Sequence, residues 1–298
     1  MLSDVLVYGT HSAVLLFGAL FCLWIVSVVV KDASLVDIFW GFGFVIVAAT
    51  CLYLAPDMTP YFIALCGAPI IWGLRLSAYL GARNLGKGED YRYQNMMKRA
   101  VKTGLSETKW RLRSLLTIYF GQGLLIMIIS APIWVGVATG LTNPEPIPDH
   151  IPDSLTQGDI SASSQTAVTL GTWTIIGGLI WFIGYLFEAI GDWQLARFKK
   201  EHKNYSGPYA DKPILNTGLW KYSRHPNYFG NALIWWGIWL MACQTPLGWV
   251  TIFAPLIMTI LLTKISGRDL LERRLKTRKA YADYIRTTPS FFPRVPKN

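Results

Sequence analysis

Apolar residues gather in seven long runs separated by shorter polar segments. The runs cover approximately residues 12–30, 37–55, 61–80, 113–137, 167–190, 228–246 and 248–266. Each approaches or reaches the ~20 apolar residues that an α-helix needs to cross a bilayer. The pattern predicts an all-α integral membrane protein, a seven-transmembrane-helix bundle forming a single membrane domain over residues 1–298. Residues 267–298 are expected to form a cytoplasmic C-terminal helix and tail.

Composition supports the membrane class. Of the 298 residues, 52% are hydrophobic and only 15% are charged, whereas a soluble domain carries about a quarter charged residues. The first apolar run has no basic segment before it. It therefore indicates a retained helix rather than a cleaved signal peptide.

The net charge of +10 is distributed unevenly. Ten Lys or Arg and three acids lie within 75–113, and further cations lie within 197–224 and 268–297. The segment 138–166 has four acids and no Lys or Arg. Because cytoplasmic loops are enriched in cations, we expect the N-terminus outside and the C-terminus in the cytoplasm. The charge reports topology and does not indicate a nucleic-acid partner.

The cysteines and histidines do not indicate a metal site. The cysteines all lie inside apolar runs without a Cys-x-x-Cys pair; they are Cys22, Cys51, Cys66 and Cys243. We interpret them as small buried hydrophobic residues. The histidines show no spacing typical of metal ligands. The sequence therefore predicts no metal.

One polar stretch, 218–231, stands immediately before the apolar segment of the sixth run. Its polar members include Lys221, Tyr222, Arg224, His225, Asn227, Tyr228 and Asn231. Gly218 suits a turn, and Pro226 suits the first turn of a helix. Free backbone N–H groups and the positive helix end, together with nearby cations, predict an anion site. A basic patch that touches lipid headgroups is the alternative.

Two ionisable residues stand out in the first half of the chain. Asp37 opens the second run, either as a helix N-terminal acid or as a carboxylate facing a substrate cavity. Arg75 lies in the third run. It either extends to the membrane interface or pairs with a ligand phosphate or with Asp37. Both pairs of interpretations stay open.

The segment 81–93 alternates glycines with charges and carries two phenols. It has no Gly-x-Gly-x-x-Gly or Walker pattern, so a folded cap over a cofactor and a solvated loop are both open. The basic segment 94–113 predicts an interfacial helix with Trp110 at headgroup level.

The end of the fifth run and the C-terminal segment carry further charges. Glu188, Asp192 and Lys199 share one helical face. Asp192 either forms a surface ion pair with Arg197 or Lys199 or accepts hydrogen bonds from a ligand. Arg268 and Glu272, four residues apart, belong to a predicted basic helix. The tail that ends at Phe292-Pro293 is expected to turn back onto the protein.

These stretches resemble a known family. Residues 220–230, WKYSRHPNYFG, resemble the signature of membrane reductases with a steroid 5α-reductase C-terminal domain, closest to a bacterial branch formerly classed as a domain of unknown function. Further stretches fit that branch: VDIFWG at 36–41, WGLR at 72–75, GKGEDYRY at 86–93, DWQLARF at 192–198 and the tail at 292–293.

The resemblance implies an NADPH-dependent enzyme that reduces a carbon–carbon double bond conjugated to a ketone in a steroid- or lipid-like substrate. An acid and a phenol would polarise the carbonyl. The catalytic candidates are Asp37, Trp72 and Tyr91. Trp72 stands where a phenol is usual, so Tyr79, Tyr91 or Tyr93 would replace it. Asn231 stands where an acid is usual.

The resemblance also implies which residues contact the cofactor. The family's cofactor-contact positions match Asp192, Lys199, Arg224, Asn227, Tyr228 and Arg268. The further cofactor candidates in the sequence are Arg75, Arg197, Lys212, Tyr222, His225, Asn231 and Glu272. The expected location is a bacterial inner membrane, with the cofactor site facing the cytoplasm.

Two other functions stay open. A membrane methyltransferase similar to isoprenylcysteine carboxyl methyltransferases would use S-adenosylmethionine and shares the Arg-His-Pro-x-Tyr pattern. The 86–93 loop, the 192–198 segment and the many cations favour a phosphorylated cofactor instead. A lipid-binding scaffold without turnover is the non-enzymatic alternative.

Overall fold

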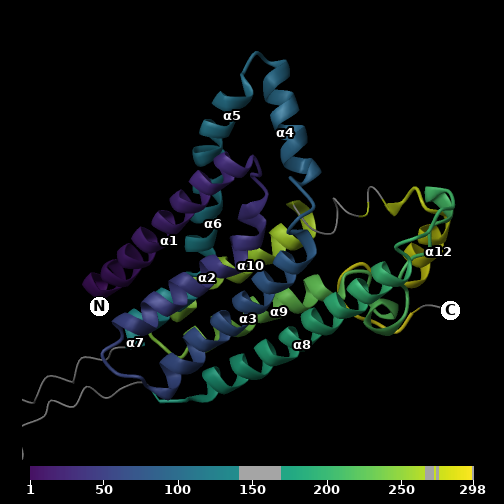
Figure 1. Cartoon of the computed structure of the whole chain (residues 1–298). Helices are drawn as coiled ribbons and strands as arrows, with labels where there is room; N and C mark the ends of the chain where they lie inside the picture. The colour runs from purple at the N-terminus through teal and green to yellow at the C-terminus, as the bar shows by residue number, and fades with distance from the viewer. Residues whose placement is uncertain (141–168, 266–271, 273–274, 297–298) are drawn as a thin grey trace, which may run out of the picture. The chain divides into compact units, whose positions relative to one another are not determined.

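The computed structural model describes residues 1–140, 169–265, 272 and 275–296 (Figure 1). Within these ranges the regular structure is helical, and they contain no strand. The all-α prediction is therefore confirmed for this part of the chain. The chain divides into two compact units. Unit 1 comprises Met1–Ile175 and Met241–Thr251, and unit 2 comprises Ile176–Leu240 and Ile252–Asn298.

Among the described residues, six helical segments are long and apolar enough to cross a membrane. They are Leu2–Val30, Leu35–Leu54, Pro60–Asn84, Glu107–Ile129, Thr172–Glu201 and Gly248–Ile265. The sixth predicted run forms α9 (Pro226–Ala242), which is not among these six; its 17 residues lie at the short end of the ~17–25 that span a bilayer. The membrane class is supported, while the count of seven and the orientation stay predictions.

In unit 1, α1 (Leu2–Val30), α2 (Leu35–Leu54) and α3 (Pro60–Asn84) lie side by side (Figure 1). The helices α2 and α3 approach each other closely where two glycines meet. A Cβ added to Gly41 would lie 2.5 Å from the carbonyl oxygen of Gly73. This backbone contact fixes the separation of the two helices.

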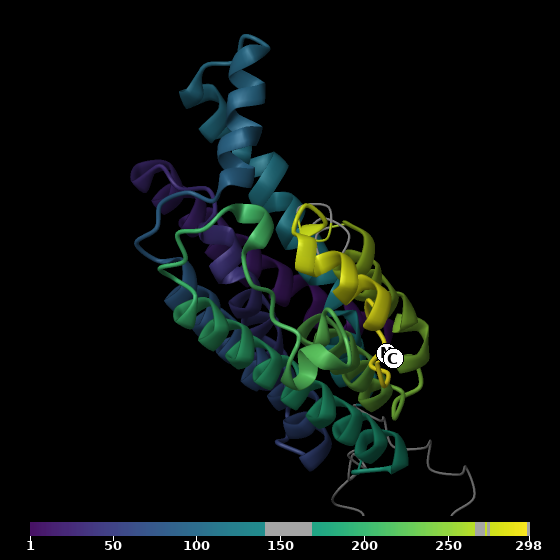
Figure 2. The same cartoon turned by 90° about the vertical axis from the view of Figure 1, so that its right-hand side faces the viewer.

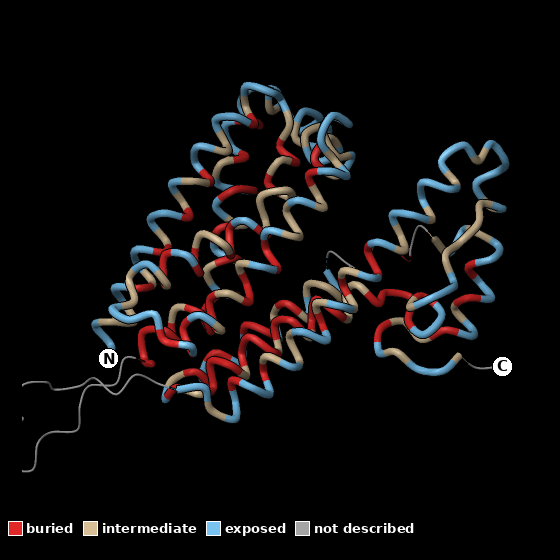
Figure 3. The backbone as a smooth tube through the Cα atoms, turned by 60° about the horizontal axis from the view of Figure 1, so that its bottom comes forward, coloured by how far each residue is buried: buried red, intermediate tan, exposed pale blue. Residues whose placement is uncertain are grey.

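The fourth predicted run is interrupted. The helical segment that contains this run, 113–137, consists of α5 (Glu107–Ser114), the π-helical segment η1 (Leu115–Phe120), α6 (Gly121–Ile129) and α7 (Ala131–Gly140). The break falls at Ser130, whose hydroxyl donates to the carbonyl of Met127 at 3.1 Å. Pro132 follows and has no N–H to continue the ladder. All residues of α7 except Trp134 are buried. Figure 3 shows the buried residues of the described chain in red.

A helical hairpin made of α4 (Tyr91–Lys102) and α5 replaces the single predicted interfacial helix. In Figures 1 and 2 the hairpin projects past the neighbouring ends of α1 and α2. Asp90 caps α4 by accepting from the backbone N–H of Arg92 at 2.9 Å. Ser106 caps α5 by accepting from that of Lys109 at 3.3 Å. Gly104, at φ 91°, allows the turn between them.

In unit 2, α8 (Thr172–Glu201, in this unit from Ile176) packs closely against α9. Glycines recur every seven residues along the contact, at 177, 184 and 191 on α8 and at 230 and 237 on α9. A Cβ added to Gly184 would lie 2.6 Å from the carbonyl oxygen of Gly230. A Cβ on Gly237 would lie 2.6 Å from that of Gly177. Backbone therefore meets backbone along this interface.

The remaining elements are short: η3 (Tyr209–Asp211), η4 (Gly218–Lys221), η5 (Gly248–Ile252), α10 (Phe253–Ile260), η6 (Leu261–Ile265) and α12 (Lys279–Thr287). Gly218 has φ 61° and Pro226 begins α9. The turn and the helix start predicted for this stretch are thus confirmed. The predicted acidic loop lies outside the described residues beyond position 140.

Candidate functional site

Asp37 lies in the first turn of α2 and is contacted by the first turn of α4. The Tyr93 hydroxyl donates to Oδ1 of Asp37 at 2.7 Å. The Arg92 guanidinium donates to Oδ2 of the same carboxylate. Arg92 also donates through Nε to Asp90 at 2.9 Å. Asp37 therefore combines a helix N-terminal position with a specific side-chain partnership.

The segment before α4 is folded against the turn between α1 and α2. The backbone N–H of Ala33 donates to Glu89 at 2.8 Å. The backbone N–H of Asp90 donates to the Ser34 hydroxyl at 3.2 Å. Of the two interpretations left open for 81–93, the structure favours a folded segment. Contact with a cofactor stays a prediction.

Burial and charge set the protonation of the groups around Asp37. Burial raises the pKa of Tyr93, and the negative charge of Asp37 raises it further. The phenol therefore keeps its proton at neutral pH. Burial alone would raise the pKa of Asp90, but hydrogen bonds from the Arg92 side chain and backbone lower it. The cluster thus joins a phenol that donates to a carboxylate that accepts.

The other catalytic candidates lie differently. Tyr91 is 53% exposed, and the phenol that meets Asp37 belongs to Tyr93. Trp72 is fully buried in α3, where its ring centroid lies 5.5 Å from that of Phe44. The role of Trp72 stays a prediction, and so does the choice among the phenols, for which the contact to Asp37 favours Tyr93 over Tyr91. Sequence reasoning missed Arg92, although it lies within the 86–93 stretch that carried the resemblance.

In unit 2 the start of α9 faces the end of α8. The Asn227 side-chain NH₂ donates to Oδ1 of the buried Asp192 at 3.0 Å. A Cβ on Gly191 would lie 3.2 Å from the backbone nitrogen of Asn227, so the glycine permits this approach. Oδ1 of Asn227 and Oδ1 of Asn231 are buried, with no hydrogen-bond partner among the described residues. Two buried acceptors are thus available.

Arg224 and Glu272 form a buried, forked ion pair. Arg224 Nε lies 3.0 Å from Oε1 of Glu272, and Nη2 lies 3.2 Å from Oε2. Arg224 Nη1 donates to the carbonyls of Ile285 at 3.2 Å and Thr288 at 2.6 Å. His225 Nε2 lies 3.1 Å from Oε1 of Glu272. The sequence predicted all three residues, Arg224, His225 and Glu272, at the cofactor; the structure brings them together.

The environment of Glu272 keeps it ionised. Burial alone would raise its pKa, but hydrogen bonds from His225 and Arg224 and the charge of Arg224 lower it to about 2. A carboxylate with two cationic or polar donors inside the protein is strongly favoured in its charged form.

Backbone and hydroxyl hydrogen bonds extend this contact into what we call the C-terminal clamp, the bonds that join 220–225 to 272–294. The Tyr284 hydroxyl donates to the carbonyls of Trp220 and Ser223. The Ser223 hydroxyl donates to the carbonyl of Phe291 at 2.8 Å. The Arg224 N–H donates to that of Pro289 at 2.9 Å. The prediction that the tail turns back onto the protein is confirmed.

Comparison with known families decides the affiliation of the chain. The family of proteins of unknown function DUF1295 matches residues 23–151 and 154–288. The chain belongs to this family. DUF1295 is a steroid 5α-reductase-like family. No curated protein and no solved structure matches the chain.

The other cofactor candidates of this DUF1295 protein lie mainly toward solvent. Arg197 is 66% exposed and its Nε lies 2.9 Å from Glu201. Lys199 and Tyr222 are exposed, while Lys212 and Arg75 are half-buried. Tyr228 stacks on His225 with ring centroids 5.4 Å apart. Arg268 lies outside the described residues.

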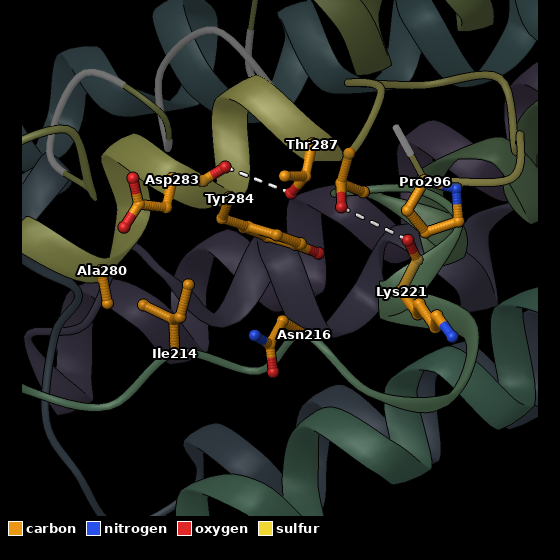
Figure 4. Close-up of a pocket in the computed structure, with 9 residues that line it drawn as sticks. Ile214, Asn216, Lys221, Ala280, Asp283, Tyr284, Thr287 and Pro296 are labelled. Carbon is orange, nitrogen blue, oxygen red and sulfur yellow. Dashed lines mark hydrogen bonds between the residues drawn. The ribbon is translucent and has the colours of Figure 1, made fainter. Parts of the chain in front are cut away.

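The DUF1295 chain also has a pocket of about 350 Å³ in unit 2. It is lined by Ile214, Asn216, Lys221, Ala280, Asp283, Tyr284, Thr287, Thr288 and Pro296 (Figure 4). None of these is among the candidate site residues. The Thr288 hydroxyl donates to the carbonyl of Lys221 at 3.3 Å, so part of the wall is the C-terminal clamp. In the described part of the chain, no group of three or more His, Cys, Asp or Glu could hold a metal.

Proposed function

We propose that this DUF1295 protein is an NADPH-dependent membrane oxidoreductase that reduces a carbon–carbon double bond conjugated to a ketone in a steroid- or lipid-like substrate. The steroid 5α-reductase-like character of the family supports the class. The observation that carries the proposal is the 2.7 Å hydrogen bond from Tyr93 to Asp37. It joins a protonated phenol to a carboxylate near the start of a membrane helix.

In this proposal Tyr93 acts as a hydrogen-bond donor and acid toward the carbonyl oxygen of the substrate. Hydride addition to the β-carbon moves the double-bond electron pair toward the carbonyl oxygen, which becomes an enolate oxygen. A donor aimed at that oxygen stabilises the developing charge. When the enone binds, the single Tyr93 O–H turns from Asp37 to that oxygen and gives up its proton. A proton from solvent then adds to the α-carbon, and the enol O–H proton returns to Tyr93 as the ketone re-forms. The products are the saturated ketone and NADP⁺.

Asp37 and Arg92 support this phenol. Because Arg92 donates to Asp37, the carboxylate acts as an acceptor rather than as the acid. Its hydrogen bond holds the phenol oxygen of Tyr93 in place before the substrate arrives. The acid and the phenol implied by the resemblance thus take different roles. Tyr93 transfers the proton, and Asp37 positions Tyr93.

Within unit 2, cofactor binding is supported by the polar groups at the start of α9. NADPH, when bound, supplies the hydride. The unpartnered Oδ1 atoms of Asn227 and Asn231 suit the N–H groups of a carboxamide or the hydroxyls of a ribose. The cations Arg197, Lys199 and Lys212 suit phosphates. The donors of Arg224 are used within the C-terminal clamp, so we assign it to positioning the 220–225 turn.

The test of the carbonyl end is Tyr93→Phe in detergent-purified protein, with NADPH oxidation followed over a panel of lipid-like enones. We expect turnover to fall roughly 10²–10⁴-fold, the usual contribution of a positioned acid. Stabilisation by NADPH should persist. The control is Tyr91→Phe, which removes an exposed hydroxyl in the same helix and should leave turnover unchanged. Normal turnover in Tyr93→Phe would contradict the proposal.

The test of the cofactor end compares NADPH, NADH and S-adenosylmethionine by thermal shift, because a ligand of the native state raises the melting temperature. We expect Asn231→Ala to weaken the NADPH shift, since it removes a buried acceptor. Asn204→Ala, at an exposed position, is the control. A shift with S-adenosylmethionine alone would overturn the reductase in favour of a methyltransferase.

A further inference from the structure

The α4–α5 hairpin is strongly basic. Residues 91–114 contain seven cations and one acid, a formal net charge of +6. The cations are Arg92, Lys98, Arg99, Lys102, Lys109, Arg111 and Arg113, and the acid is Glu107. A charge this concentrated between two membrane helices needs a counter-charge that the hairpin itself does not provide.

Two of these cations form ion pairs with the described residues of the protein. Arg92 pairs with Asp37 and Asp90. Arg111 lies 3.0 Å from Glu107 and 3.7 Å from Glu89. The other five are exposed and form no ion pair with the described residues: Lys98, Arg99, Lys102, Lys109 and Arg113. Their charge is available to an external anion.

Exposed apolar side chains alternate with these cations. Met96 and Val101 flank the cations of α4, and Leu112 lies between those of α5. A surface that combines cations with large apolar side chains suits the headgroup level of a bilayer. An acidic protein or a nucleic acid would leave the apolar side chains in water, so the composition favours lipid.

The hairpin is attached to membrane helices at both ends. Six residues separate the end of α3 from Tyr91, and α5 continues through η1 into α6 within the span Glu107–Ile129. The Trp24 indole donates to the backbone carbonyl of Arg111 at 3.1 Å, which sets the base of α5 beside the last turns of α1. Lys109 and Arg113, two residues from Arg111, therefore lie close to the end of a membrane helix, whereas Lys98, Arg99 and Lys102 lie farther out along the hairpin (Figure 1).

We propose that the α4–α5 hairpin binds the headgroups of anionic phospholipids in the bilayer that holds the protein. Clusters of four to eight Lys or Arg beside a membrane helix attract anionic lipid in this way. Among the described helices, α4 packs extensively only against α5. Headgroup contact at residues 98–102 therefore steadies the same helix whose first turn contacts Asp37.

The experiment measures hydrogen exchange of residues 91–114 in nanodiscs of phosphatidylcholine, with or without phosphatidylglycerol. We expect exchange to slow by about tenfold or more with phosphatidylglycerol, because each cation near an anionic surface contributes about fivefold in affinity. The slowing should diminish as salt is raised.

The variant Lys98→Gln/Arg99→Gln/Lys102→Gln should lose most of this difference between the two lipids. The matched control, Lys98→Arg/Arg99→Lys/Lys102→Arg, preserves charge and should retain it. Equal exchange of the wild-type hairpin in both lipids would overturn the proposal, as would retention of the difference in the Gln variant. A response to added polyglutamate but not to phosphatidylglycerol would identify a protein-docking surface and would also overturn it.

Discussion

The buried pair of Arg224 and Glu272 gives a prediction whose size follows from the structure. Glu272→Gln removes the negative charge and leaves the Arg224 guanidinium buried without its counter-ion. The pKa of Glu272 is lowered from 4.5 to about 2. At ~1.4 kcal/mol for each pKa unit, the environment favours the ionised form by roughly 3 kcal/mol. Breaking a buried ion pair by removing one partner costs about 3–5 kcal/mol, which agrees in size.

The matched control is Glu201→Gln. Glu201 lies 2.9 Å from Arg197, nearly the 3.0 Å of the buried pair, but its side chain is 52% exposed against 11% for Glu272. An exposed ion pair contributes only ~0–1 kcal/mol. The two variants therefore make the same chemical change at almost the same distance and differ in burial.

Hydrogen exchange of α12 measures the result, because Arg224 binds the carbonyls of Ile285 and Thr288 at the end of that helix. A loss of about 3 kcal/mol predicts roughly 100-fold faster exchange of the α12 amides in Glu272→Gln. Glu201→Gln should change them less than about fivefold. Equal effects of the two variants would refute the reasoning that burial makes the C-terminal clamp strong.

Three further predictions concern stability. Because the pKa of Glu272 is lowered in the folded protein, its contribution is present above about pH 4.5 and is lost as the pH falls toward about 2; acid unfolding should show this dependence in the wild type and not in Glu272→Gln. Gly184→Ala should destabilise the protein by ~1–3 kcal/mol, since its Cβ would meet the facing α9 backbone at 2.6 Å. Gly178→Ala, with nothing within 4 Å of its Cβ, should be neutral or stabilising in thermal unfolding. Tyr284→Phe should cost ~1–2 kcal/mol in the same assay by leaving buried carbonyls unpaired, whereas equal loss in Tyr205→Phe would point to a nonspecific effect.

The apolar runs predicted where helices occur but not where they begin or break. The first run was expected at 12–30, whereas α1 starts at Leu2. Polar residues in its first half do not end the helix, because His11 and Ser12 find partners at Val7 and Cys51. In the run at 113–137, Pro132 was the one residue whose type indicated the helix break that the structure has at Ser130.

The sequence predicted individual residues of the candidate site but not which of them contact one another. Asp37 and the 86–93 stretch were singled out, yet Tyr93 and Tyr91 were indistinguishable, since both are phenols two positions apart. What selects Tyr93 is the fold of 85–90 against the α1–α2 turn, through the Glu89 and Asp90 contacts. Contacts between residues this far apart in the chain produce no periodic pattern in the sequence, so the sequence does not predict them.

Arg224 shows the opposite case. Its position in a basic motif before a helix indicates an anion, and the anion it meets is a carboxylate of the chain itself, 48 residues later. The charge pattern of the sequence indicates that a cation needs an anionic partner. Only the structure shows whether that partner is a residue of the chain or a ligand.

The seven-residue glycine spacing between α8 and α9 has a consequence for how this sequence can vary. At Gly184, Gly230 and Gly237 a single methyl group would strike main-chain atoms, which no change of rotamer can relieve. A library of all single substitutions should therefore show intolerant positions recurring every seventh residue along these two helices, with permissive lipid-facing positions between them. The Asp192–Asn227 hydrogen bond lies at one end of this series, beside Gly191. Substitutions elsewhere on these two helices should therefore leave the relative position of Asp192 and Asn227 unchanged.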